Sequence, residues 1–145
     1  MNLAIVNGPN LQALGRREPE HYGQQTMDSI LENLHRTMPR HRIDYFQSNH
    51  EGALIDCLYE LESRGCSGVV LNAGGYTHTS VALADCIRTV NMPVVEVHLS
   101  NIFAREDFRH KSLISNACIG VIAGFGPEVY AMGVRALEDF CKNKR

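Results

Sequence analysis

The chain has 145 residues, of which 44% are hydrophobic and 21% are charged, and its formal net charge is −2. This length and composition are ordinary for one globular domain, expected here over residues 1–145, with enough chain to bury a core. The charge balance excludes an overall basic field that would recruit nucleic acid or an anionic membrane surface. A local pair of arginines still suffices to hold an anionic small-molecule substrate.

The five cysteines are odd in number and widely spaced, and no two of them form a C-x-x-C motif. This pattern predicts small core side chains in a reducing compartment, with neither a disulfide framework nor a zinc site. The apolar run at residues 3–6 lacks preceding basic residues and is too short for a signal peptide or a membrane span. We therefore expect a cytoplasmic protein.

Predicted strands and helices alternate along the chain. Apolar runs predict strands at residues 3–6, 43–47, 68–71, 93–98 and 119–123, and helical spacing predicts helices near 27–38, 53–61, 80–90 and 129–140. Thr26 is expected to cap the first helix, while the second helix should open near Asn49 and close at Gly65. Strands that are apolar on both faces favour a parallel sheet between helical layers. The expected fold class is α/β, a flavodoxin-like doubly wound five-stranded parallel sheet with helices on both faces.

Polar clusters follow three of the predicted strands. N-G-P-N at residues 7–10 follows the first strand, and N-A-G-G-Y-T-H-T-S at 72–80 follows the third. H-L-S-N at 98–101 begins at the end of the fourth strand and leads to Arg105 and Arg109. Because the carboxyl ends of parallel strands meet at one sheet edge, we expect these clusters to form one ligand-binding crevice.

A long polar segment runs from the first strand to Gln25, and connections of this length are often functional lids. It contains Arg17 and Tyr22. A phenol has a pKa of about 10 in water, and a nearby guanidinium favours the phenolate, which can take a proton from a carbon beside a carbonyl. His98, at the sheet edge, could protonate a leaving hydroxyl. A base and an acid without metal or cofactor describe an elimination of water.

The same residues also have purely structural interpretations. Gly8 and Pro9 are compatible with a simple turn, His78 and His98 with semi-buried histidines, and Arg105 with a solvated ion pair. A flavodoxin-like module that binds a small anion or nucleotide without catalysis is the alternative function. Such a module would need the crevice and its arginines, but it would have no need for the tyrosine in the loop.

Together these motifs resemble the type II 3-dehydroquinate dehydratases over nearly the whole chain. The resemblance rests on N-G-P-N-L at 7–11, L-G-R-R-E-P with Y-G at 14–23, L-N-A-G-G-Y-T-H-T-S at 71–80, and E-V-H-L-S-N with A-R-E and F-R-H at 96–110. Gln12, Ala13 and Phe103 depart from the family pattern, and none of them falls on a catalytic position.

The resemblance implies that water is removed from 3-dehydroquinate to give 3-dehydroshikimate, through an enolate and without a metal, Schiff base or other cofactor. By matching positions, Tyr22 would be the base and Arg17 would hold it as phenolate. Asn10 would help to bind a water that stabilises the enolate. His98 would be the general acid, oriented by Glu96.

The resemblance also implies binding residues and an assembly. The substrate's hydroxyls and carboxylate would be bound by Asn72, His78, Arg109 and the backbone of Leu99 and Ser100. The family forms homododecamers built from trimers, in which the residue matching Asp85 reaches a neighbouring subunit's site. Outside the family, Asp85 would equally suit a solvated helix surface. The reaction belongs both to the shikimate pathway of aromatic amino acid biosynthesis and to quinate metabolism, and the sequence leaves both open.

Overall fold

The computed structural model of the chain describes residues 1–16, 20 and 24–144. One sheet contains five parallel strands, β1 Asn2–Asn7, β2 Arg42–Gln47, β3 Gly68–Asn72, β4 Val94–His98 and β5 Gly120–Ala123. Their order in the sheet is β2-β1-β3-β4-β5. This order confirms the expected flavodoxin-like, doubly wound fold.

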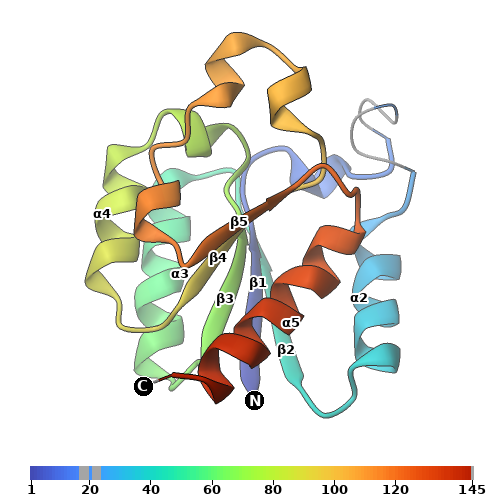
Figure 1. Cartoon of the computed structure of the whole chain (residues 1–145), viewed down its shortest axis with the longest axis vertical. Helices are drawn as coiled ribbons and strands as arrows, with labels where there is room; N and C mark the ends of the chain where they lie inside the picture. Colours follow the sequence, from blue (N-terminus) through green and yellow to red (C-terminus); the bar gives the residue numbers. More distant parts are fainter. Residues whose placement is uncertain (17–19, 21–23, 145) are drawn as a thin grey trace.

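Helices cover both faces of the sheet (Figure 1). They are α2 Met27–Thr37, α3 Glu51–Ser63, α4 Val81–Thr89 and α5 Glu128–Lys142. Side chains alternate across a strand, so Leu3 and Ile5 of β1 pack with α2 and α5, whereas Ala4 and Val6 pack with α3 and α4. The hydrophobic core therefore consists of two layers separated by the sheet.

The helix ends largely follow the sequence signals. Thr26 caps α2 as expected, because its hydroxyl accepts the backbone N–H of Ser29 at 3.3 Å. Gly65 follows the end of α3 with a φ of +78°, a conformation that glycine adopts without strain. As expected, α3 opens near Asn49, although Asn49 is not its N-cap, which is His50. The Asn49 side chain instead accepts the backbone N–H of Asn10 at 2.9 Å, which ties the start of α3 to the loop after β1.

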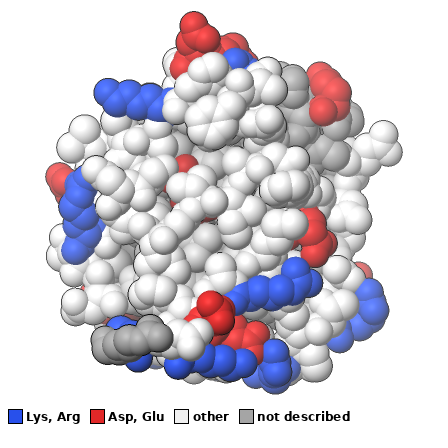
Figure 2. All heavy atoms as spheres, viewed as in Figure 1, with Lys and Arg blue, Asp and Glu red and all other residues white. Residues whose placement is uncertain are grey.

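The edge strand β5 is less buried than its apolar sequence predicts. β1, β3 and β4 are buried almost throughout, but Val121 of β5 is 45% exposed and Ile119 beside it is 40% exposed. Figure 2 shows mostly uncharged side chains in the middle of the face that carries α5 and β5, with charged side chains scattered towards its rim. In the single chain, the β5 edge is thus an uncovered apolar strip.

Two further features concern the described part of the chain as a whole. Within residues 1–16, 20 and 24–144, no helix combines the length and the apolar character needed to cross a membrane. The five cysteines are free thiols, and Cys57 and Cys86 are buried.

Candidate active site

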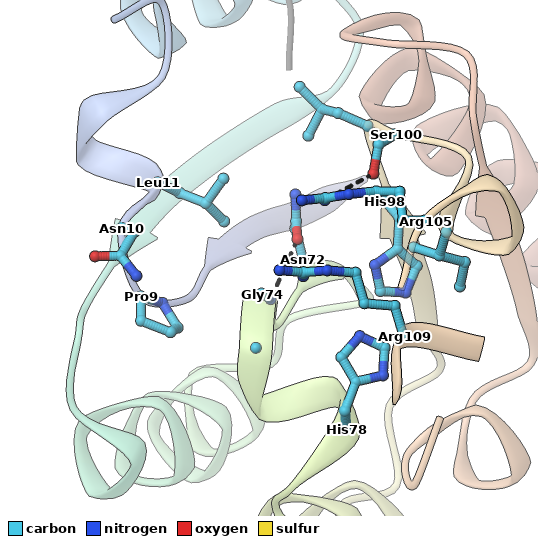
Figure 3. A pocket seen from close by; sticks show the side chains of 13 residues that line it. Pro9, Asn10, Leu11, Asn72, Gly74, His78, His98, Ser100, Arg105 and Arg109 are labelled. Carbon is cyan, nitrogen blue, oxygen red and sulfur yellow. Dashed lines mark hydrogen bonds between the residues drawn. The ribbon is translucent and has the colours of Figure 1, made fainter. Parts of the chain in front are cut away.

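A cavity of about 200 Å³ opens at the carboxyl edge of the sheet, beside the ends of β1, β3 and β4. The chain leaves β1 towards one side of the sheet and leaves β3 towards the other, so the two loops diverge at this point. The sequence analysis expected eleven site residues. Seven of them line the cavity, and Figure 3 shows most of these. The seven are Asn10, Asn72, His78, His98, Leu99, Ser100 and Arg109. The three polar clusters therefore meet, as predicted.

The other four expected residues lie elsewhere or are not described. Glu96 is fully buried and contacts the cavity through His98. The Asp85 side chain is 68% exposed on α4 and pairs with Arg88 at 3.1 Å, so it does not line this chain's own cavity. Arg17 and Tyr22, with the lid expected around them, lie outside the described residues.

The loops after β1 and β3 touch through backbone atoms. The N–H of Gly8 donates to the carbonyl of Asn72 at 2.7 Å. A Cβ at Gly8 would stand only 2.5 Å from the carbonyl oxygen of Ala73, so a residue without a side chain is required there. The Gly8-Pro9 turn is thus part of the cavity wall, and the next residue, Asn10, is held in the left-handed region at φ 70°.

His98 and Glu96 form a buried pair on β4. Residues two apart on a strand point to the same face, and the Nε2 of His98 lies 2.6 Å from the Oε2 of Glu96. Burial raises the pKa of the Glu96 carboxyl, but hydrogen bonds from His98 and two serines outweigh it and hold that pKa below its usual range. A carboxylate only accepts hydrogen bonds, so Nε2–H donates to it and Nδ1 is left for a ligand. This pair is suited to proton transfer.

His78 faces the same cavity but donates a hydrogen bond through its other ring nitrogen, Nδ1. Its Nδ1 lies 2.7 Å from the carbonyl of Lys111, which can only accept, so Nδ1 carries the proton. Burial is the main cause that lowers the pKa of His78. At neutral pH the ring is therefore uncharged, and its Nε2 can accept a hydrogen bond from a ligand hydroxyl. Its ring stacks against that of His98, with centroids 6.3 Å apart.

Two arginines give the cavity its positive charge. The guanidinium groups of Arg105 and Arg109 both point into the pocket in Figure 3. The Arg105 side chain is only 7% exposed and donates to the hydroxyl of Ser100 at 3.3 Å. Arg105 does pair with Glu106, at 3.7 Å between Nε and Oε1, but its own side chain is buried at the cavity instead of solvated, and it was missing from the expected site. Its position four residues before Arg109, in the segment after β4, was the available signal.

A buried hydrogen-bond network on the side away from the cavity fixes the Asn72 side chain. The Asn72 amide donates to the hydroxyl of Tyr130 at 3.2 Å, and that hydroxyl donates to the Oδ1 of Asn7 at 2.8 Å. Asn7 and Asn72 lie on the face of the sheet that α5 covers, and Tyr130 is fully buried. The phenol of α5 thus orients an amide that lines the cavity.

Replacing Tyr130 with phenylalanine is expected to destabilise the fold by about 1–3 kcal/mol, because two buried amides lose their shared partner. Urea unfolding of the variant measures this change. Tyr59→Phe, at a position 42% exposed, serves as the control and should leave the unfolding free energy nearly unchanged. Equal unfolding midpoints for the two variants would contradict the assigned network.

Among the residues that the structure describes, no cluster of three or more His, Cys, Asp or Glu side chains is placed to hold a metal ion. The described site instead offers a histidine backed by a carboxylate, a neutral histidine, a fixed amide and two guanidinium groups. These groups can bind a small, hydroxylated carboxylic acid and exchange a proton with it.

Residues 1–138 match the family model described as class II dehydroquinase. The chain belongs to this family. It is accordingly an enzyme of the hydro-lyase class. A 3-dehydroquinate dehydratase of Chlorobaculum tepidum is 61% identical over 137 residues, which are 94% of this chain and 93% of that protein.

Two solved structures show the same likeness in three dimensions. The type II dehydroquinase of Butyrivibrio crossotus is 38% identical and superposes with a TM-score of 0.91, covering 95% of this chain and 97% of that one. The type II dehydroquinase of Propionibacterium acnes is 33% identical, with a TM-score of 0.88 and coverage of 98% and 97%. The class II dehydroquinase fold therefore extends over nearly the whole chain.

Proposed function

We propose that the chain catalyses the reversible dehydration of 3-dehydroquinate to 3-dehydroshikimate. The observation that carries the proposal is the Glu96–His98 pair at the base of a cavity walled by Arg105 and Arg109. A passive anion-binding module would need the guanidinium groups but not a histidine held by a buried carboxylate. The names of the relatives support the choice of substrate.

In this proposal, the phenolate of Tyr22 removes a proton from the carbon next to the ketone, and an enolate forms. Arg17 keeps Tyr22 ionised, and Asn10 helps to hold a water that stabilises the enolate oxygen. When the enolate collapses, the bond to the leaving hydroxyl breaks and His98 gives that oxygen a proton, so water departs. The roles of Tyr22 and Arg17 are supported by the chemistry of a phenol and a guanidinium in one loop and by the family resemblance.

The remaining groups hold the substrate during these steps. The carboxylate of the substrate binds to Arg109 and to the backbone of Leu99 and Ser100. Asn72 and the neutral His78 bind its hydroxyls, which suits an amide held by Tyr130 and an imidazole whose Nε2 accepts. Orienting the substrate in this way supplies part of the rate enhancement.

The test is direct addition of 3-dehydroquinate to the purified protein. The product contains a carbon–carbon double bond conjugated with its ketone, so its formation appears as an increase in ultraviolet absorbance. If the protein is a binding module, calorimetry will detect binding of 3-dehydroquinate while the absorbance stays constant. That result would disprove the proposed dehydratase activity and favour the alternative, a module that binds a small anion without catalysis.

We also propose that the enzyme works in the cytoplasm as a homo-oligomer, a dodecamer built from trimers. The five free thiols favour a reducing compartment. Exposed apolar side chains at the β5 edge, such as Val121, favour association. The reaction serves either the shikimate pathway or quinate metabolism, and the neighbouring genes distinguish these roles.

Asp85→Ala is expected to weaken both assembly and kcat/KM, because we propose that this exposed carboxylate on α4 reaches the site of a neighbouring subunit. Analytical ultracentrifugation gives the assembly, and steady-state kinetics gives kcat/KM. Asp56→Ala, at an exposed position on α3, is the matched control and should change neither. A monomer with full activity would disprove the subunit-bridging role without affecting the catalytic assignments.

A further inference from the structure

Glu96 is held by two serines on the side away from His98. Its Oε1 accepts the hydroxyl of Ser115 at 2.6 Å and that of Ser112 at 3.0 Å. The other carboxyl oxygen, Oε2, faces His98 at 2.6 Å. Glu96 is 0% exposed, so these three donors take the place of water around a buried charge. Neither serine lines the catalytic cavity.

Backbone contacts determine which way the Ser112 hydroxyl points. Its oxygen accepts the N–H groups of Ile114 and Ser115 at 3.2 and 3.0 Å. With both lone pairs occupied, its own proton is directed to Glu96. The backbone of the turn after Lys111 thus orients the Ser112 hydroxyl as a donor. The second serine, Ser115, is the first residue of η5 Ser115–Ala117.

These contacts determine where the carboxyl group can hold a proton. Two donated hydrogen bonds occupy Oε1, so a proton on Glu96 could sit only on Oε2, which faces the Nε2 of His98. Donors to the ionised form favour it over the protonated form. The serines therefore act against transfer of the histidine proton to Glu96.

We propose that Ser112 and Ser115 are positioning residues for the general acid. They keep Glu96 ionised, so that the Nε2–H of His98 stays in place and Nδ1 carries the proton delivered to the substrate. This inference rests on the proposed role of His98. It extends the acid–base unit from the His98–Glu96 pair to a four-residue chain that reaches into the segment before β5.

Other titratable groups surround Glu96. His98 contacts it from β4, and His78 of η2 Gly74–His78 stacks against the His98 ring. His110 shares with Glu96 a second cavity beside β5. The Cys118 thiol stays neutral at working pH, because burial raises its pKa to about 12. The effect of the serines must therefore be measured on Glu96 itself.

The test is Ser115→Ala, which removes the shorter of the two serine hydrogen bonds. We expect the titration midpoint of the Glu96 carboxyl to rise by about one to two pH units, the effect of losing one hydrogen bond to a charged group. Carbon-13 NMR of glutamate carboxyls measures this midpoint, with Glu96→Gln assigning the signal. The acidic limb of the kcat profile should move upward by the same amount, while substrate affinity at neutral pH stays the same.

Ser115→Thr keeps the hydroxyl and should restore the midpoint. Ser63→Ala is the control, since that exposed hydroxyl of α3 donates to its own helix at 2.8 Å. If Ser115→Ala does not fold, Ser115→Cys replaces it and should give a smaller upward shift, because a thiol is a weaker donor. An unchanged midpoint in a folded variant, or a loss of kcat that is equal at every pH, would overturn the proposal. The titration requires no turnover, so a wild type without dehydratase activity would overturn only the proposed function.

Discussion

Tyr22→Phe is expected to lower kcat by roughly 10²–10⁴-fold, the usual contribution of general acid–base catalysis, with little change in substrate affinity. Phenylalanine keeps the ring and removes only the oxygen that takes the proton. Steady-state kinetics with 3-dehydroquinate gives kcat, and equilibrium binding of the substrate to the inactive variant gives its affinity.

The control is Tyr59→Phe, which removes a phenol from the exposed surface of α3 and should leave kcat near the wild-type value. If Tyr22→Phe retained about a tenth of the activity or more, Tyr22 would not be the base. A weaker affinity with unchanged kcat would instead assign the hydroxyl to substrate binding.

His98→Ala is expected to lower kcat by a similar factor, roughly 10²–10⁴-fold, because the general acid is removed. It should also destabilise the fold at neutral pH, since Glu96 loses the donor at 2.6 Å while remaining buried. Because the pKa of Glu96 is lowered in the folded protein, its ionised carboxylate stabilises the native state at pH values above the usual carboxyl pKa. This contribution is lost as the pH falls through the lowered pKa of the folded protein. The stability difference between wild type and variant should therefore shrink under acid conditions.

His98→Gln separates the two effects. The glutamine amide still offers Glu96 an N–H donor, so most of the stability should return while kcat stays low. His35→Ala, on the exposed surface of α2, controls for the loss of an imidazole elsewhere. Catalysis by His98→Gln at the wild-type rate would remove His98 from the acid role and leave it a structural function.

Much of the fold follows from patterns that lie close together in the sequence. The apolar run at residues 68–71 and the Thr26 cap gave the right elements, because both signals depend on neighbouring residues alone. The exposure of Val121 on β5 could not be predicted in this way, since it depends on the place of β5 at the edge of the sheet. The role of Asn49 was missed for a related reason, because its partner Asn10 is 39 positions away.

The site was predictable where strand ends bring polar clusters together, as with Asn72 and His98. It was less predictable where a side chain reaches the cavity from a loop without regular spacing. The burial of Arg105 depends on how the segment after β4 folds back over the pocket, and no local pattern encodes that path. The serine contacts to Glu96 were missed because they join residues 16 and 19 positions apart through an irregular turn.

The phenol of Tyr130 joins Asn7 to Asn72, and it lies 123 positions after Asn7 in the chain. A ribosome therefore makes β1 and β3 long before it makes the residue that joins their carboxyl ends. A nascent chain can pair its first strands, but its binding pocket becomes ordered only after α5 has been made and has packed on the sheet.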